Sequence, residues 1–359
     1  MFFIYYYKKN LSHKGNIQMS KLYWTSSDIQ KVFRFDLRAK GMQTLFNAEK
    51  RGEIPTAERT KRGSVGIRQW QTAQIPQIGA RFGFLKLPDD QVIIVIYVPK
   101  GGVLKTGTAH NFAKIFALNN IKTLLVDLEP MQRSLTKYTI PRQDIESLEE
   151  LENLPETLGL YHFFFEKAPI ETIIKKTSLP TLDIIPATPE LAYLELKIGM
   201  QARREFLFKE KLIPNLKQYN VIIFDNGSSF NQLVMNALCA SNNFLLPLGC
   251  DAEAYESLDV SLDNVFDFIR DSHIELKNIM YLPTLLENTK LSQQIYAKYL
   301  NEYKENVIPF PIKRNVKGQD ARLLNLSVIE YAPTCDLAQD YYHSACDIWK
   351  RVTNNTGVC

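Results

Sequence analysis

The chain has 359 residues, of which 45% are hydrophobic and 23% are charged, and its formal net charge is +4. This composition predicts a globular chain, long enough for one large domain and a smaller one. Because the net charge is mild, any nucleic-acid signal has to come from local clusters of basic residues. The five cysteines form no C-x-x-C pair, and we expect reduced thiols rather than disulfides or metal ligands.

The apolar run at the N-terminus, within Met1–Asn10, is too short to span a bilayer, and its charges follow the run instead of preceding it. We therefore expect residues 1–18 to be a disordered leader, with Met19 as an alternative start. The same observation leads us to expect a cytoplasmic protein with no membrane partner.

Residues 19–88 form a basic region that predicts a small, mainly helical domain. Ser26-Ser-Asp28 is a helix-capping sequence, and apolar residues at helical spacing follow within 29–33 and again within 42–46. Basic residues then gather around two glycines in the segment 54–70, as at the tip of a hairpin that contacts phosphates.

Two short helices followed by a basic hairpin resemble a MerR-type winged helix-turn-helix. The resemblance rests on Arg51-Gly-Glu-Ile-Pro55, Arg62-Gly63 and Ile67-Arg68. It implies DNA binding, with four arginines as phosphate contacts: Arg51, Arg59, Arg62 and Arg68. The alternative is a helical dimerisation module whose charges only keep it soluble.

The turn signal at Leu87–Asp90 predicts a boundary between domains 19–88 and 89–359. Beyond it, apolar runs alternate with helical patterns, which predicts an α/β domain with a mostly parallel, doubly wound sheet. The expected strands are 92–98, 122–127, 182–185, 220–225, 243–247, 278–282 and 306–310.

The segment 91–129 predicts a phosphate-binding loop. An apolar strand runs into Pro99-Lys-Gly-Gly-Val-Leu-Lys-Thr-Gly-Thr-Ala109, a helical stretch follows, and a second strand ends at Asp127. Glycine N–H groups and a helix N-terminus can bind phosphate oxygens, while a lysine and a threonine hydroxyl can reach the β/γ-phosphates and Mg²⁺. The usual pattern G-x-x-x-x-G-K-[ST] is not met, because Pro99 and Leu104 replace its glycines.

Residues 100–106, Lys-Gly-Gly-Val-Leu-Lys-Thr, instead match the deviant Walker A pattern K-G-G-x-x-K-[ST]. With this loop, the chain resembles the ParA-type partition ATPases, in the superfamily of MinD and the nitrogenase iron protein. Further segments match that family in order: 124–130 ("LLVDLDPQ"), 220–229 ("YDYIIIDCPPS"), 236–240 ("NALAAAD"), 289–293 ("RTKLSQ"), 313–317 ("IPRNVR") and 327–333 ("PVIEYDP"). The basic N-terminal region fits the larger, plasmid-borne members.

The resemblance implies roles for individual residues. ATP or ADP would be bound by the loop residues Lys100, Gly101, Gly102, Val103, Leu104, Lys105, Thr106 and Gly107. Lys105 would hold the β/γ-phosphates, and Lys100 would reach the partner's phosphates across a dimer that encloses the nucleotide. Mg²⁺ would be bound by Thr106, with Asp225 and Asp127 in its outer shell.

Three positions depart from the family. Glu129 stands where the family has an aspartate that orients the attacking water, so we expect slow hydrolysis. Asn226-Gly227 replaces a Cys/Thr-Pro pair. Asn288 replaces an arginine used for nonspecific DNA contact, which leaves Arg314 and Lys317 as basic candidates for that surface.

These residues lead us to expect a weak ATPase for plasmid partition. It would dimerise around ATP and Mg²⁺, bind DNA nonspecifically near the nucleoid, work with a ParB-like centromere-binding protein and repress its own operon. The alternative is a nucleotide-sensing, DNA-binding transcriptional regulator with little ATPase activity.

Overall fold

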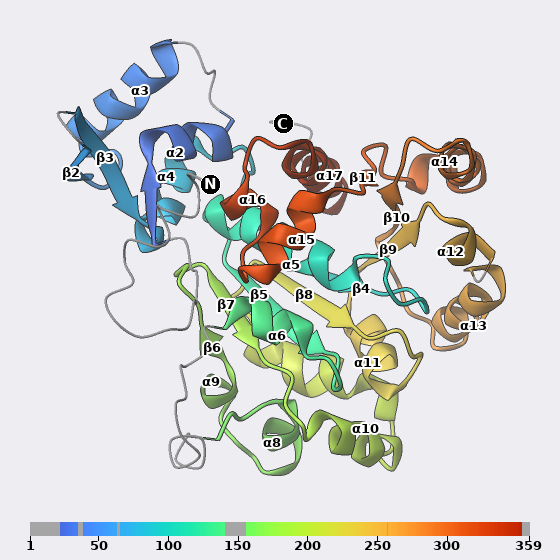
Figure 1. Ribbon diagram of the computed structural model, residues 1–359. Helices are drawn as coiled ribbons and strands as arrows, with labels where there is room; N and C mark the ends of the chain where they lie inside the picture. Colours follow the sequence, from blue (N-terminus) through green and yellow to red (C-terminus); the bar gives the residue numbers. More distant parts are fainter. Residues whose placement is uncertain (1–21, 35–38, 63–64, 141–155, 257, 354–359) are drawn as a thin grey trace, which may run out of the picture.

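A computed structural model of the chain describes residues 22–34, 39–62, 65–140, 156–256 and 258–353 (Figure 1). The side chains of residues 39–40, 61–62, 65 and 259–261 are not described. The leader expected at residues 1–18 lies outside the described residues.

The described residues form a large sheet with the strand order β11-β10-β9-β4-β8-β5-β7-β6, in which every pair is parallel except β6 with β7. The mostly parallel α/β sheet is therefore confirmed. Its strands are β4 (Val92–Ile96), β5 (Thr123–Leu128), β6 (Lys175–Lys176), β7 (Leu182–Ile185), β8 (Val221–Asn226), β9 (Asn243–Gly249), β10 (Asn278–Leu286) and β11 (Ile312–Lys313).

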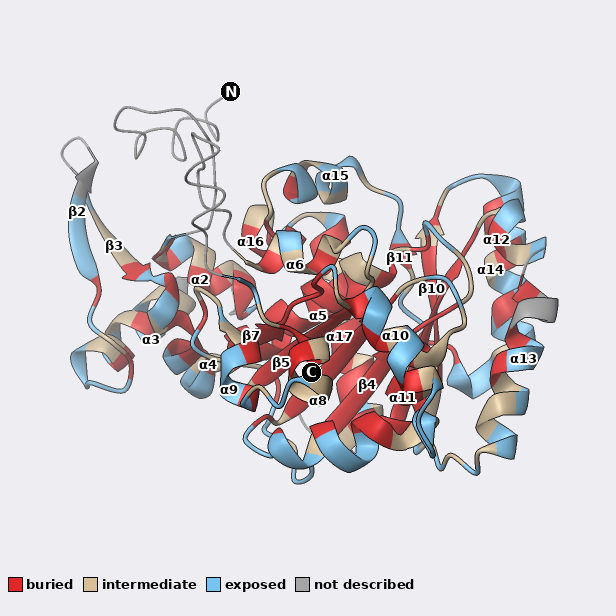
Figure 2. Cartoon of the chain, turned by 90° about the horizontal axis from the view of Figure 1, so that it is seen from below, coloured by how far each residue is buried: buried red, intermediate tan, exposed pale blue. Residues whose placement is uncertain are grey.

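Side chains that alternate along each strand enter two hydrophobic clusters, one on each face of the sheet. In β4, Ile94 and Ile96 belong to one cluster, while Ile93 and Val95 belong to the other. All five residues of β4 are buried, which explains why the strand is an uninterrupted apolar run. Figure 2 shows the same pattern, with buried strands at the centre and helices exposed on their outer sides.

Helices cover both faces of the sheet (Figure 1). On one face lie α5 (Lys105–Leu118), α6 (Ser134–Thr139), α16 (Val328–Tyr331) and α17 (Asp336–Thr353), with α15 (Val316–Leu323) beside them. On the other face lie α8 (Leu160–Phe165), α9 (Ile170–Ile173), α10 (Leu191–Gly199), α11 (Gln232–Ala240), α12 (Ala252–Glu256), α13 (Leu258–Asp271) and α14 (Lys290–Tyr303). Short turns complete the chain at η2 (Arg204–Phe206), η3 (Phe208–Leu212), η4 (Ile213–Asn215) and η5 (Lys304–Asn306).

The N-terminal module, residues 22–82, combines short helices with a small antiparallel sheet of order β1-β3-β2. Its elements are β1 (Tyr23–Thr25), α2 (Ser26–Val32), α3 (Ala39–Lys50), β2 (Glu58–Arg62), β3 (Val65–Gln71), η1 (Thr72–Gln74) and α4 (Ile75–Phe82). Helix α2 is capped by Thr25, the residue before the expected capping sequence Ser26-Ser-Asp28, through a capping box with Asp28. Two helices followed by a hairpin thus lie where the sequence indicated them.

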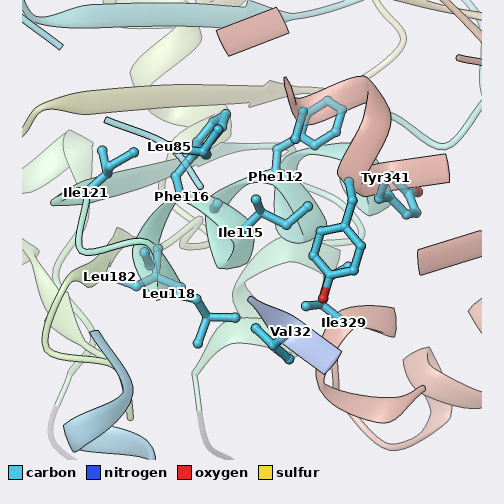
Figure 3. Packing of buried hydrophobic residues seen from close by; sticks show 14 of the residues in the cluster. Val32, Leu85, Phe112, Ile115, Phe116, Leu118, Ile121, Leu182, Ile329 and Tyr341 are labelled. Atoms are coloured by element: carbon cyan, nitrogen blue, oxygen red, sulfur yellow. The ribbon is translucent and has the colours of Figure 1, made fainter. Parts of the chain in front are cut away.

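The N-terminal module packs directly on α5, the helix that follows the phosphate-loop sequence. Gly79 of α4 lies so close to the end of α5 that a Cβ atom at residue 79 would stand 1.8 Å from the carbonyl oxygen of Leu118. The Oδ1 atom of Asn119 accepts hydrogen bonds from the backbone N–H groups of Phe84 (2.7 Å) and Leu85 (3.2 Å). Figure 3 shows residues of α5 together with Val32 of α2 in one hydrophobic cluster.

Two sequence-based expectations are wrong. Residues 306–310 do not form a strand: Val307 makes an isolated bridge to Tyr281, and the edge strand is β11, at 312–313. Pro309 and Pro311 lack the N–H groups that a strand there would need. Cys239, Cys250 and Cys335 are free thiols, but Cys346 is disulfide-bonded. Among the described residues, no helix has the length and apolar character of a membrane span.

Candidate nucleotide-binding site

The loop between β4 and α5 has an open, left-handed backbone. Gly102 has φ of +80°, and Leu104, the residue before α5, has φ of +65°. No other atom lies within 4 Å of a Cβ built at Gly101 or Gly102, so this stretch of backbone faces open space. The left-handed conformation costs a residue with a Cβ about 1–2 kcal/mol, and Leu104 therefore holds local strain where the helix begins.

Lys105 is buried at the first position of α5, and its ammonium turns back into the loop. The Nζ atom donates hydrogen bonds to the carbonyl oxygens of Val98 (3.3 Å) and Lys100. Burial lowers the pKa of Lys105 to about 8, although the charges of Asp225 and Glu129 oppose this change. A buried ammonium within a ring of backbone groups is a binding group for phosphate oxygens.

Asp225 is the next-to-last residue of β8, close enough to this ammonium to interact with its charge, and has the environment of a cation ligand. Neither of its buried carboxylate oxygens has a hydrogen-bond partner of good geometry among the described residues, although the Thr106 hydroxyl lies close enough to favour the charged form. Burial raises its pKa well above the ordinary value, the nearby Asp127 adds to the rise, and Thr106 and Lys105 oppose it. An unpaired buried carboxylate is costly unless a cation neutralises it, so Asp225 and the Thr106 hydroxyl fit Mg²⁺.

Asp127, paired with Asp225 across β5 and β8, holds the loop that follows β5. One oxygen accepts from the backbone N–H (2.8 Å) and hydroxyl (2.7 Å) of Thr136, and the other accepts from the N–H of Glu129 (3.1 Å). Burial raises its pKa to about 6, against the effect of these hydrogen bonds. Asp127 therefore organises the loop carrying Glu129 and lies beside Asp225.

Glu129 lies at the same edge of the sheet, in the loop between β5 and α6. Its Oε1 atom accepts a hydrogen bond from the backbone N–H of Met131 (3.1 Å), and its charge contributes to the pKa values of Lys105 and Asp225. The structure thus brings together four of the predicted residues, Lys105, Asp127, Glu129 and Asp225. Among the described residues, no group of three His, Cys, Asp or Glu side chains is placed to hold a metal ion.

A cavity of about 520 Å³ opens beside the loop and is large enough for a nucleoside. One wall is the loop itself, from Lys100 to Leu104 with Gly107, and the opposite wall is Lys313–Asn315 with residues of α15. Helix α16, whose Val328 also lines the cavity, is attached to α5 through Asn111: its Oδ1 accepts from the N–H of Val328 (2.9 Å), and its Nδ2 donates to the carbonyl of Gly107 within α5 (2.7 Å).

Two basic residues expected to contact DNA lie in or near this wall. Arg314 lines the cavity and forms an ion pair with Glu287. Lys317, at the start of α15, forms an ion pair with Asp320 at 3.5 Å. Arg314 is therefore placed beside the nucleotide loop.

In the N-terminal module, the four expected phosphate contacts differ in their surroundings. Arg51 is exposed and pairs with Glu53 at 2.6 Å. Arg68 is half-buried, pairs with Glu49 at 2.9 Å and stacks 3.9 Å above the ring of Phe46. Arg59 is exposed on β2, directly opposite Arg68 in the hairpin, whereas the side chain of Arg62 is outside the described part of the chain.

A comparison with protein families gives a match to a model described as an AAA domain, over residues 91–279, more than half of the chain. The sporulation initiation inhibitor protein Soj of Bacillus subtilis is 30% identical over 73% of this chain and 98% of its own length. The chromosome partitioning protein ParA of Myxococcus xanthus is 29% identical over 73% of this chain and 89% of its own length. The chain belongs to the ParA-type ATPases.

Solved structures of ParA-type and related proteins share the fold. A plasmid partition protein from Borrelia burgdorferi bound to AMPPNP has a TM-score of 0.59 at 23% identity, covering 74% of this chain and all of that one. Cobyrinic acid a,c-diamide synthase from Mycobacterium smegmatis, with an ATP analogue and magnesium, has a TM-score of 0.57 at 22% identity, covering 75% and 98%. At these identities the likeness shows the fold alone.

Several residues of this ParA-type site were not expected from the sequence. His110, Tyr138 and Arg322 also line the cavity, and burial lowers the pKa of His110 to about 3, which keeps its imidazole neutral. The buried Lys114 and Glu330 form an ion pair at 3.0 Å between α5 and α16. The sequence indicated a likeness to the family at 313–317 and 327–333. It did not indicate that residues of these segments line the same cavity as the loop, which only the folded chain shows.

Proposed function

We propose that this chain is a partition ATPase that closes into a dimer around ATP and Mg²⁺ and binds DNA in that state. One observation carries the proposal: the unpaired, buried Asp225 faces Lys105 and Thr106 at the base of an open glycine loop beside a nucleoside-sized cavity. Lys105 holds the β/γ-phosphates, and the loop from Lys100 to Gly107 surrounds the nucleotide.

Mg²⁺ would supply positive charge beside the Asp225 carboxylate, and the phosphates would supply negative charge beside the Lys105 ammonium. Thr106 and Asp225 hold Mg²⁺, Asp127 fixes the loop beside it, and Glu129 orients the attacking water. Lys100, half-buried at the outer edge of the loop, reaches the partner's phosphates and stabilises negative charge during transfer. Hydrolysis is slow, because the Glu129 carboxylate is carried on a longer side chain than the family's aspartate.

Two substitutions test this arrangement. Lys105→Ala removes the buried ammonium and is expected to abolish binding of a fluorescent ATP analogue. Lys100→Ala is expected to leave that binding within a few-fold of the native chain but to prevent ATP-dependent dimerisation, measured by light scattering. Lys350→Ala, on the exposed last turn of α17, is the matched control. A normal ATP-dependent dimer of Lys100→Ala would contradict the cross-interface role.

The N-terminal module is proposed to be a winged helix-turn-helix that binds the operator of its own gene. The β2–β3 hairpin projects away from the body of the molecule (Figure 2), and Arg59 lies exposed on it. Arg51 and Arg62 are further phosphate contacts. Arg59→Ala is expected to weaken DNA binding and to lower its salt slope by about one. Arg68→Ala, by contrast, is expected mainly to lower stability, because Arg68 packs on Phe46 and Glu49.

Nonspecific DNA binding by the ATP dimer is proposed to use Lys317 and Arg314, on a cytoplasmic protein that follows the nucleoid. A ParB-like protein on centromere sites stimulates hydrolysis and releases the dimer. Duplex DNA without an operator, titrated at two salt concentrations with and without ATP, tests the first statement. Binding that is unaffected by ATP would contradict it.

The alternative function is a nucleotide-sensing transcriptional regulator with little ATPase activity. The direct packing of the N-terminal module on α5 favours this alternative, because it links the operator-binding part to the nucleotide loop. Steady-state hydrolysis with and without DNA and partner separates the two functions. Rates at background in both conditions, with operator binding intact, would leave the regulator as the function.

A further inference from the structure

Glu129 and Gly227 leave the sheet side by side. Strands β5 and β8 are neighbours, and their last paired residues are Leu128 and Asn226. The residues that follow, Glu129 and Gly227, therefore enter the site together at the carboxyl edge of the sheet. Both stand at positions where this chain departs from the family.

The carboxylate of Glu129 occupies the space that a side chain at residue 227 would need. A Cβ atom built on Gly227 would lie 2.3 Å from Oε2 and 3.3 Å from Cδ of Glu129. On its other side, Oε1 accepts the hydrogen bond from the N–H of Met131 at 3.1 Å. The carboxylate is thus held between one backbone donor and the bare backbone of Gly227, and any other residue at 227 would displace it.

We propose that Gly227 is a positioning residue for Glu129, and this inference rests on the proposed role of Glu129 in orienting the attacking water. The two departures from the family form a matched pair. Glutamate carries its carboxylate one methylene further than aspartate does, and Gly227 provides the room for that longer reach. The glycine sets where the carboxylate stands without contacting the nucleotide itself.

The size of the effect follows from the overlap. To make an ordinary contact with a Cβ at residue 227, the Oε2 atom would have to move by about 1 Å. A misplacement of about 1 Å in a group that positions a reactant costs on the order of 10²-fold in rate. The fold is affected little, because the displaced atom is the end of a flexible side chain.

The test measures ATP hydrolysis with DNA in full-length Gly227→Ala and Gly227→Val, together with affinity for the ATP analogue and thermal unfolding. We expect kcat to fall tenfold or more and further with the larger side chain, while nucleotide affinity and KM change less than about twofold. Gly199→Ala is the matched control, since nothing lies within 4 Å of a Cβ at that glycine, and its kcat is expected to be unchanged.

The same substitutions are then made in Glu129→Asp, whose shorter side chain withdraws the carboxylate from residue 227. There Gly227→Ala is expected to change kcat less than about twofold. Equal losses in both backgrounds, or a native series with unchanged kcat, would overturn the inference. Glu129→Ala is measured as the reference without a carboxylate. If Glu129→Asp is no faster than this reference, the inference is decided by the effect of Gly227→Ala and Gly227→Val on kcat in the chain that retains Glu129. Absence of hydrolysis in the native chain is a different outcome, which contradicts the proposed ATPase instead.

Discussion

The contact between Gly79 and the end of α5 makes a strong prediction about stability. In Gly79→Ala the new Cβ would stand 1.8 Å from the carbonyl oxygen of Leu118, 2.9 Å from its carbonyl carbon and 3.2 Å from Cα of Asn119. These are backbone atoms at the end of a buried helix, so no side-chain movement can relieve the overlap. Helices α4 and α5 have to separate by more than 1 Å to reach an ordinary contact.

This separation has a calculable cost. It breaks or stretches the two hydrogen bonds from the N–H groups of Phe84 and Leu85 to Asn119, each contributing about 0.5–1.5 kcal/mol. Overpacking in a filled interior adds about 1–3 kcal/mol. We therefore expect Gly79→Ala to lower the free energy of unfolding by about 3 kcal/mol. The destabilisation is expected in the contact between the N-terminal module and α5.

Chemical denaturation followed by circular dichroism and by tryptophan fluorescence is the assay. Trp24 and Trp70 are buried in the N-terminal module, so an early fluorescence transition would report its release. Gly66→Ala is the control, because nothing lies within 4 Å of a Cβ at Gly66. A Gly79→Ala chain within about 0.5 kcal/mol of the native chain would refute the reasoning, since the two helices would then not be in this contact.

Three further predictions concern the site. Leu104→Gly is expected to be about 1 kcal/mol more stable than Leu104→Ala, because only glycine adopts the left-handed φ without strain, and thermal unfolding of both variants checks this. Burial raises the pKa of Asp127 to about 6 and that of Asp225 well above its ordinary value, so both groups bind protons more tightly in the folded chain. The stability they contribute is full below about pH 4 and is lost as the pH rises through their folded pKa values, so without Mg²⁺ the unfolding temperature is expected to fall across that range. Added Mg²⁺ and nucleotide are expected to raise it again at neutral pH in the native chain but much less in Asp225→Asn, and equal stabilisation of the two chains would exclude Asp225 from the cation site.

Much of the fold was predictable because its signals are local. The run Val92–Ile96 is apolar at every position because both of its faces are covered, and the glycine loop and helix follow it directly in the chain. The failed strand at 306–310 had the apolar residues but also contains Pro309 and is followed by Pro311, and prolines remove ladder hydrogen bonds. Apart from this segment, periodicity predicted the element types correctly but their ends only approximately.

Site residues could be predicted where a short motif assigns the residue its role. They could not be predicted where the role depends on contacts with residues from distant segments of the chain. Lys105, at the start of the helix after the glycine loop, and Asp225, near the end of a buried strand, could be predicted from their positions in the sequence. Arg314 stays a predicted DNA contact, and the packing of β11 against β10 also brings it to the nucleotide cavity, a position that the sequence did not indicate. Likewise, Arg68 belongs to a basic cluster in the sequence, yet in the folded module it is paired with Glu49 and stacked on Phe46.

Helix α5 connects the two functions that the sequence indicated separately. Its first residue, Lys105, turns its ammonium onto backbone carbonyls of the loop, and bound phosphates would compete for that ammonium. Its last turn lies about 20 Å away at the rise of an α-helix. There Leu118 contacts Gly79 of the N-terminal module, and Asn119 accepts a hydrogen bond from Phe84, in the segment that follows the module. Because the helix is buried along nearly its whole length, it can transmit a shift at the loop only as a rigid body. A nucleotide that repositions Lys105 would therefore shift the end of α5, against which Gly79 of the N-terminal module packs.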